Sequence, residues 1–207
     1  MPRTTLVADV EGNSVPIYAP GASRPAMVLP NPWFLNGVSS EPIPQAFLVE
    51  EARPDGWVRV LLPERPNGSS GWIPPGSAKL LVDPYRIQVS LHEHRMTVIR
   101  FGSVVYSGPV AIGASATPTP TGLLYIRVLL HTTNPSSAYG PYAYGLSAHS
   151  QALSTFDGGD AEIGLHGNND ASVLGRSVTH GCVRMDNAEI SRLAAVLPLG
   201  TPVQISG

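Results

Sequence analysis

The chain has 207 residues with a formal net charge of −2, and 43% of its residues are hydrophobic while 14% are charged. These values exclude a disordered chain or a charged coiled coil, and they give no basic footprint for nucleic acid or anionic lipid. No apolar run approaches the roughly 20 residues of a membrane-spanning helix. Glycine and proline, 21 of each, separate short apolar runs, which predicts a mainly β protein of short strands and turns.

A β-hairpin is predicted in the first part of the chain. Residues 56–63 and 71–74 have the apolar pattern of strands. The polar stretch 65–70 between them contains Asn67-Gly68, a pair that accepts positive φ in a turn. We therefore expect the two strands to pair in an antiparallel manner.

Residues 1–83 contain all three tryptophans, Trp33, Trp57 and Trp72. Trp57 and Trp72 could line a ligand groove, but tryptophans in such strands are more often part of a core. The two segments around them, Trp-Val-Arg-Val and Gly-Trp-Ile, resemble bacterial SH3-like barrels found beside cell-wall enzymes. This resemblance implies a small SH3-like β domain over residues 1–83, which serves in wall binding or in packing.

A second domain is expected over residues 84–207, beginning at Asp83-Pro84. Alternating apolar residues predict four strands within it, and polar or turn residues separate them in a way that suits a meander. The predicted strands are residues 85–91, 95–100, 104–110 and 123–129.

One helix is predicted near the C-terminus. Asp186 can cap its N-terminus, and Glu189 follows three residues later as in a capping box. Apolar residues then recur at helical spacing, namely Ile190, Leu193, Ala194 and Leu197. Pro198 and Gly200 end the helix, and residues 201–205 predict a last short strand.

The single cysteine, Cys182, excludes an internal disulfide. A lone cysteine is more often a small buried hydrophobe than a reactive group, but its neighbours favour reactivity. His180 and Arg184 lie two residues to either side, and on an extended segment all three side chains share one face. Nearby cations lower the pKa of a thiol, which predicts a populated thiolate. His166 can reach the sulfur only through the fold.

The glycines beside these residues also have a predicted role. Gly181 permits a close backbone approach next to the nucleophile, and the backbone N–H groups around Gly181 and Cys182 could stabilise an oxyanion. Gly167 leaves the carbonyl that follows His166 uncrowded. That carbonyl could then accept the ring N–H and fix the tautomer.

These residues resemble the catalytic signature of the L,D-transpeptidase (YkuD-type) family. That signature is a His-Gly pair, a spacer holding Asn and Gly, and then Ser/Thr-x-Gly-Cys-hydrophobic-Arg/Asn. The matching positions are His166, Gly167, Asn169, Gly175, Thr179, Gly181, Cys182, Val183 and Arg184. Residues 117–126 resemble the family's TPTG-x-(F/Y)-x-I segment, and residues 134–147 resemble its substrate-side loop. The resemblance as a whole covers roughly residues 84–206.

The resemblance implies an L,D-transpeptidase-type β-sandwich or barrel with one or two short helices. It also implies that Cys182 attacks the carbonyl before the terminal D-alanine of a peptidoglycan stem tetrapeptide, with His166 as its base. D-alanine leaves, and the amine of a second stem resolves the thioester to form a cross-link. Water as acceptor would instead make an L,D-carboxypeptidase. No metal or organic cofactor is implied, and carbapenem β-lactams are implied as covalent inhibitors.

Further residues have predicted roles at the site. His180 tunes the thiol or contributes to the oxyanion hole. Arg184 either binds a substrate carboxylate or holds the loop through backbone carbonyls. The remaining substrate-binding candidates are Thr179, Asn169, Tyr142 and Tyr144. The two tyrosines form either a lid over the thiol, which is favoured because long loops beside active sites often gate them, or surface aromatics of a long loop. Tyr125 is expected in the core.

The location of the protein is also an expectation. The first residues contain one Arg but no apolar core of a signal peptide. The residues alone leave open a cytosolic protein or one whose export segment lies upstream. The resemblance implies an extracytoplasmic place in the bacterial cell envelope or periplasm, where the enzyme would act in peptidoglycan biosynthesis and cell shape.

The same residues also bear on three other functions: a wall-binding protein, a sortase and a zinc site. A non-catalytic wall-binding protein would not need intact Cys182, His166 and Gly181. A sortase also uses Cys, His and Arg, but its cysteine follows a Thr-Leu-x-Thr strand that is absent from this sequence. A zinc site is conceivable from His166, His180 and Cys182, but the glycine pattern favours acyl transfer. His92 and His94 lack a third ligand, and His131 and His149 have no partner that the sequence indicates.

Overall fold

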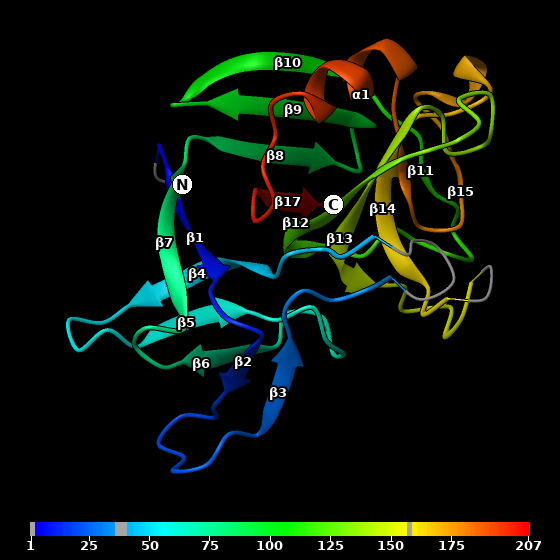
Figure 1. The fold of residues 1–207 in the computed structure, drawn as a ribbon. Helices are drawn as coiled ribbons and strands as arrows, with labels where there is room; N and C mark the ends of the chain where they lie inside the picture. The colour runs from blue at the N-terminus through cyan, green and yellow to red at the C-terminus, as the bar shows by residue number, and fades with distance from the viewer. Residues whose placement is uncertain (1–2, 36–40, 157–158) are drawn as a thin grey trace.

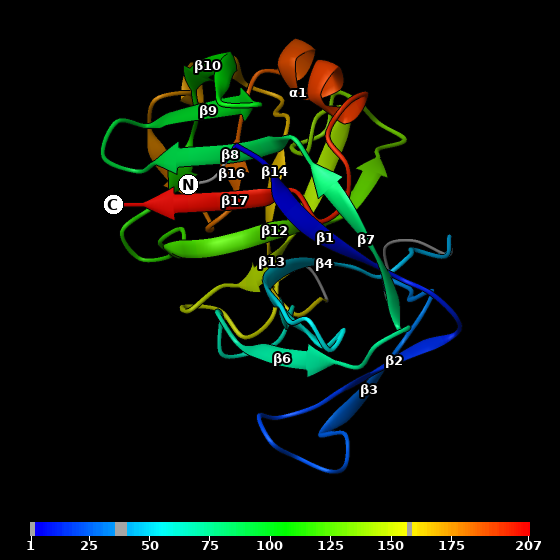
Figure 2. The same cartoon turned by 90° about the vertical axis from the view of Figure 1, so that its left-hand side faces the viewer.

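The computed structural model describes residues 3–35, 41–156 and 159–207. Its strands form a smaller unit, strands β1 to β7, and a larger unit, strands β8 to β17 with helix α1. We call them the first and the second unit. Figure 1 shows the first unit below the large sheet of the second, and Figure 2 shows β1 and β7 lying alongside that sheet.

The first unit is built on a five-stranded antiparallel sheet with the order β6-β5-β4-β1-β7. A hairpin of β2 and β3 lies beside it, and Tyr18 just after β2 bridges to Trp72. The strands are β1 Thr5–Val10, β2 Ser14–Ile17, β3 Met27–Pro30, β4 Ala46–Ala52, β5 Val58–Leu61, β6 Ser70–Ile73 and β7 Ala78–Asp83.

The predicted hairpin is confirmed, because β5 and β6 pair in an antiparallel manner with Val58 opposite Ile73. Trp72 is buried in this unit, as expected. Trp57 is only half-buried, and its ring meets the Tyr18 ring edge-on at 5.2 Å. The SH3-like class of the unit and its role stay predictions.

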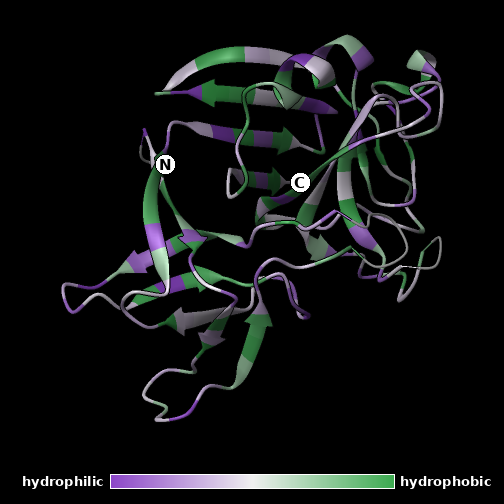
Figure 3. Ribbon diagram, in the orientation of Figure 1, coloured by the Kyte–Doolittle hydropathy of each residue, from purple (hydrophilic) through white to green (hydrophobic). Residues whose placement is uncertain are grey.

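The second unit is an eight-stranded sheet with the order β10-β9-β8-β17-β12-β13-β14-β16, and a two-stranded pair of β11 and β15 lies beside it. Hydrophobic and hydrophilic residues alternate along several of its strands (Figure 3). The strands are β8 Tyr85–Ser90, β9 Arg95–Arg100, β10 Ser103–Pro109, β11 Ile112–Gly113, β12 Gly122–His131, β13 Tyr142–His149, β14 Glu162–His166, β15 Ser177–Thr179, β16 Val183–Arg184 and β17 Pro202–Ser206.

The predicted meander holds for β8, β9 and β10 but is wrong for the fourth strand. β12 does not lie beside β10, because the C-terminal strand β17 pairs in parallel with β8 and antiparallel with β12. The sheet is therefore closed by a pairing between residues more than a hundred positions apart, which local alternation does not encode.

The predicted helix is confirmed as α1, Asn187–Ala194, with Asp186 as its N-cap. The Asp186 carboxylate accepts from the N–H groups of Ala188 and Glu189 at 2.8 and 3.2 Å. A 3₁₀ turn, η1 Ala171–Val173, is the other helical element among the described residues. The mainly β class with short helical elements is confirmed, and in the described part of the chain no helix is long and apolar enough to cross a membrane.

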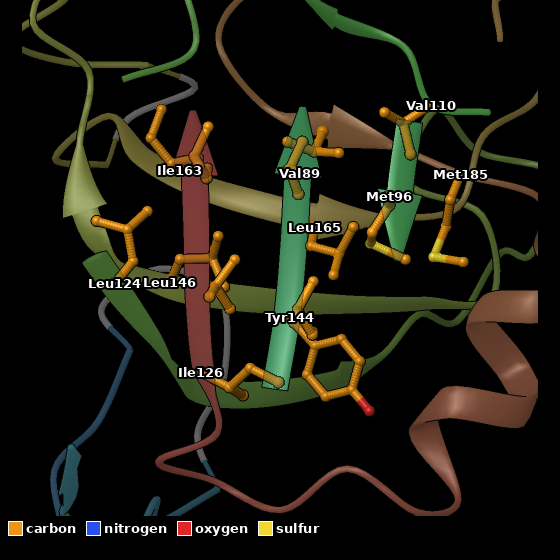
Figure 4. Packing of buried hydrophobic residues seen from close by; sticks show 14 of the residues in the cluster. Val89, Met96, Val110, Leu124, Ile126, Tyr144, Leu146, Ile163, Leu165 and Met185 are labelled. Carbon is orange, nitrogen blue, oxygen red and sulfur yellow. The ribbon is translucent and has the colours of Figure 1, made fainter. Parts of the chain in front are cut away.

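The core of the second unit lies between the curved sheet and α1. Figure 4 shows side chains from β8, β9, β12, β13 and β14 packed together, with Met185 and Val110 beside them. Burying each of these apolar side chains stabilises the fold by about 1.5–3 kcal/mol. The core therefore holds in place the ends of β14 and β16, where the site lies.

Candidate active site

A pocket of about 260 Å³ opens at the edge of the large sheet, beside Cys182. Its lining includes His166 from the end of β14, Arg184 from β16, Thr179 from the end of β15 and His180 from the turn after it. The fold thus brings four of the predicted site residues to the thiol, although His166 is sixteen residues away from it in the sequence.

Strand β14 supplies the floor of this pocket. Residues alternate between the two faces of a strand, so Glu162, Gly164 and His166 face the same side. The Gly164 N–H donates to Cys182 Sγ at 3.3 Å. A Cβ at Gly164 would lie 3.6 Å from that sulfur and 3.4 Å from His166 Cδ2. The imidazole and the thiol therefore flank one point, and Gly164 is a site residue to which the sequence analysis assigned no role.

His166 is buried and held in one tautomer. Its Nδ1 lies 2.7 Å from the Gly167 carbonyl oxygen, and because a carbonyl can only accept, Nδ1 carries the proton. This is the hydrogen bond that the His-Gly pair predicts, and it leaves Nε2 as the free base. Burial lowers the pKa of His166 to about 4; the bond to Gly167 opposes this and the Arg184 charge adds to it. The imidazole is neutral at pH 7.

The predicted lowering of the Cys182 pKa is wrong. Burial raises the pKa of the thiol above its usual value, and the Gly164 N–H and the Arg184 charge oppose this only in part. The desolvation of a thiolate outweighs one N–H and one cation. At rest the site therefore holds a neutral thiol beside a neutral imidazole.

The turn that carries Cys182 is bent, not extended as expected. Gly181 has a φ of 119°, and a Cβ there would lie 3.0 Å from Ile163 Cδ1, so only glycine fits easily. The Thr179 hydroxyl donates to the Cys182 carbonyl at 2.6 Å and accepts from the Gly181 N–H at 3.2 Å. His180, Cys182 and Arg184 still line one pocket, and the Thr179 side chain closes the turn.

The TPTG-like segment supports the same turn from outside. Thr119 is buried, and its hydroxyl donates to the Gly181 carbonyl at 2.8 Å while accepting from the Gly113 N–H at 2.8 Å. The Thr117 hydroxyl donates to the Thr179 carbonyl at 3.1 Å. These threonines therefore bracket the turn that carries Cys182, which gives the upstream motif a structural reason.

Arg184 is tied to the sheet through its backbone. Its N–H and carbonyl both bond to Ala111 at 2.9 Å. Its side chain lines the pocket, and its Nε is buried without a hydrogen-bond partner among the described residues. A half-buried arginine whose Nε has no partner in the described part of the chain is suited to a carboxylate ligand. Of the two predicted roles, the geometry supports carboxylate binding.

Tyr144 is not a lid or a substrate-binding residue, so that prediction is wrong. It is fully buried, and its hydroxyl donates to the Leu193 carbonyl in α1 at 2.9 Å. Figure 4 shows its ring among the core residues. Tyr142 stacks on His131 with ring centroids 4.9 Å apart and does not line the pocket. Both belong to β13, whose pairing removes them from the loop.

Tyr139, from the same aromatic stretch, is the tyrosine that reaches the site. Its ring centroid lies 4.9 Å from that of His166. His180, another lining residue, is exposed, and its ring lies 5.3 Å from that of Phe156. Tyr139 and Phe156 were missed as site residues, although the richness of residues 136–144 in tyrosine pointed to the right segment.

Asn169 is not brought to the thiol either. It is exposed and lines a separate shallow depression with Asn168 and Asn187. Its neighbour Asn168 is buried and has the structural role: its N–H donates to Asn187 Oδ1, and Asn187 Nδ2 donates back to its carbonyl, both at 2.8 Å. This reciprocal pair fixes the chain after Gly167, where a Cβ would overlap Asn187 Oδ1.

Tyr125 is fully buried, so its predicted place in the core is confirmed. Glu162 is a pocket-lining residue that was missed; its carboxylate accepts a hydrogen bond from Arg127 at 2.6 Å.

Within residues 3–35, 41–156 and 159–207, no three His, Cys, Asp or Glu side chains are grouped as metal ligands. His92 is exposed, and His94 Nε2 lies 2.8 Å from Ser177 Oγ.

Residues 84–205 match the family model of the L,D-transpeptidase catalytic domain, YkuD. YkuD of Bacillus subtilis strain 168, named as an L,D-transpeptidase, is 34% identical over 132 residues, which are 64% of this chain and 72% of that protein. Its counterpart from Bacillus licheniformis is 31% identical over 155 residues, or 72% of this chain and 86% of that protein. A solved L,D-transpeptidase structure from Mycobacterium tuberculosis H37Rv aligns over 77% of this chain and 98% of its own, at 17% identity and a TM-score of 0.49. This chain therefore belongs to the L,D-transpeptidase (YkuD) family.

Proposed function

We propose that this protein is a peptidoglycan L,D-transpeptidase that works through a thioester on Cys182. The observation that carries the proposal is the paired geometry at Gly164: the thiol and the imidazole flank one point, and the Gly167 carbonyl holds Nδ1 so that Nε2 is the free base. A structural cysteine would not need a histidine held in this tautomer.

In the first half-reaction, the thiol proton passes to His166 Nε2 while Sγ attacks the carbonyl before the terminal D-alanine of a stem tetrapeptide. Because both groups are neutral at rest, this proton transfer accompanies the attack. The C–N bond then breaks, His166 returns the proton to the departing amine, and D-alanine leaves. A thioester between Cys182 and the stem remains.

The developing oxyanion needs donors that are already in place. The Gly181 N–H is engaged by Thr179 Oγ1. Among the described residues, the Cys182 N–H has no acceptor, and we assign it to the oxyanion. The exposed His180 ring at the pocket edge is the second candidate donor. Arg184, with its unused Nε, would bind the carboxylate of the leaving D-alanine.

In the second half-reaction, the amine of another stem attacks the thioester, His166 takes its proton, and an amide cross-link forms as the thiol is restored. Water in the same place would release a tripeptide, which is the carboxypeptidase outcome. Because the proposed substrate lies outside the cytoplasm, we propose that the protein acts in the extracytoplasmic cell envelope.

Intact-protein mass spectrometry with a disaccharide-tetrapeptide tests the proposal. The wild type should gain the mass of the acyl group and release D-alanine, while Cys182→Ala should do neither. His92→Ala, which changes an exposed histidine outside the pocket, is the matched control and should behave as the wild type. If the wild type stays unmodified while a maleimide still titrates Cys182, the thiol is accessible but not arranged for acyl transfer, and the proposal fails.

A further inference from the structure

One wall of the Cys182 pocket is held from the first unit. We call the described residues 149–156 and 159–162, between the end of β13 and the start of β14, the pocket wall; Ser150, Leu153, Phe156 and Glu162 of this wall line the pocket. The turn between β5 and β6, residues 62–69, lies against it. We propose that Arg65 in this turn is a positioning residue that sets the pocket wall for the acyl donor, an inference that rests on the proposed function.

Arg65 bonds directly to the backbone of residues that line the pocket. Its Nη1 donates to the Ser150 carbonyl at 2.8 Å and its Nη2 to the Leu153 carbonyl at 3.4 Å. Its Nε and Nη2 reach one oxygen of Asp160 at 3.4 and 3.3 Å. A guanidinium presents several donors in a rigid plane, so one side chain ties together both arms of the pocket wall.

Asn67 in the same turn fastens the start of the pocket wall. Its Nδ2 donates to the His149 carbonyl at 2.8 Å, and the His149 N–H donates back to its Oδ1 at 2.9 Å. His149 is buried, and its Nε2 lies 3.1 Å from the other oxygen of Asp160. Asp160 is thus held by Arg65 on one side and by His149 on the other.

The pocket wall has few sheet hydrogen bonds of its own, so the contacts from the first unit matter for its shape. The pairing of β13 with β14 shifts register between Gly145 and His149 and resumes with one pair, His149 opposite Glu162, at the ends of the wall. Beyond it, the described backbone bonds within the wall are Ser150 N–H to the Ala161 carbonyl and the reciprocal pair of Phe156 and Gly159. Segments with few sheet hydrogen bonds open at low free energy, so their shape depends on outside contacts.

A second contact from the first unit reaches the other end of the pocket wall. The guanidinium of Arg127 lies 4.1 Å from the centre of the Trp33 ring, and its Nη1 donates to Glu162 at 2.6 Å. Trp33 also packs with Ile43 on Val128 of β12. The first unit therefore supports the wall at both ends. Among the described contacts, only those of Arg65 donate to backbone carbonyls of pocket-lining residues.

The test compares Arg65→Ala, Arg65→Lys and a control, Arg53→Ala, in the full chain. Arg53 belongs to the first unit and stacks on Trp72 at 3.6 Å. We measure thioester formation with a tetrapeptide donor over a range of concentrations, hydrogen–deuterium exchange of residues 149–156, and the melting temperature. Arg65→Ala should raise the half-saturating donor concentration roughly tenfold, the effect of losing about one charge-assisted hydrogen bond. Its maximal rate should change little, because Cys182 and His166 are untouched.

Exchange in residues 149–156 should quicken in Arg65→Ala, Arg65→Lys should lie between it and the wild type, and Arg53→Ala should match the wild type. If Arg65→Ala folds and keeps the wild-type half-saturating concentration, the inference is overturned while the proposed function stands. If the wild type itself forms no thioester, the proposed function fails, and unchanged exchange in Arg65→Ala would then overturn the inference separately. Should Arg65→Ala not fold, Arg65→Lys and Asn67→Ala decide by the same measurements.

Discussion

The protonation of the resting Cys182–His166 pair can be measured through the pH dependence of thiol alkylation. Iodoacetamide is uncharged and reacts with the thiolate. Burial raises the pKa of Cys182 above the usual value of roughly 8.5, so less than about 3% of the thiol is ionised at pH 7. The alkylation rate should therefore climb at least about thirtyfold between pH 7 and its alkaline plateau.

Acylation by a donor should have a different profile, because it depends on a neutral His166. With the pKa of His166 lowered to about 4, the imidazole can accept a proton throughout the neutral range. Acylation should be half-maximal near pH 4 and level above about pH 5, where alkylation is still rising. In His166→Ala the level region of donor acylation should be lost, while alkylation should continue to climb with pH.

Both rates are read by intact-protein mass spectrometry on the same sample series, with Cys182→Ala as the blank. An ion pair of thiolate and imidazolium would instead give rapid alkylation that is already level between pH 5 and 8. That result would refute the neutral pair, and it would restore the lowered pKa that the cations near Cys182 predict.

Further predictions address the same residues. His166→Ala should lower the donor acylation rate more than His180→Ala, since His166 is the proposed base; the reverse order in single-turnover kinetics would exchange their roles. Tyr144→Phe should destabilise the fold by about 1 kcal/mol in denaturant melts without slowing acylation, whereas Tyr139→Ala should change acylation. Meropenem should give one stable adduct of drug mass on the wild type and none on Cys182→Ala, and a wild type left unmodified by excess drug would count against acyl transfer. The folded pKa of His166 is lowered from 6.5 to about 4, so the unfolded state binds more protons between these values. His166 should therefore contribute a fall of roughly 2 kcal/mol in unfolding free energy from pH 7 to pH 5, and the total fall should be smaller by about this amount in His166→Ala.

Local features of the protein were determined by the sequence. The strands β8, β9, β10, β12 and β17, the hairpin at residues 56–74 and the Asp186 cap of α1 were predicted from residues that are near each other in the chain. The His166 tautomer belongs to the same class, because its acceptor is the carbonyl of the next residue. Such contacts form whenever the local conformation forms, so a pattern of residues is enough to predict them.

The tertiary structure decided which residues line the pocket. Neighbouring tyrosines and asparagines have equivalent local signals, and only sheet pairing buries Tyr144 while leaving Tyr139 at the site. The same holds for Asn168, which is fixed by Asn187, and Asn169, which is exposed. A residue type in a loop therefore indicates a segment and does not identify the side chain that reaches the ligand.

The electrostatics of the thiol and the role of the first unit were also decided by the tertiary structure. The charges beside Cys182 are visible in the sequence, but the desolvation that outweighs them arises from strands and turns packed around the sulfur. The bonds from Arg65 to Ser150 and Leu153 join residues more than eighty positions apart. Burial and long-range contacts are properties of the whole packed chain, and a short stretch of residues does not specify them.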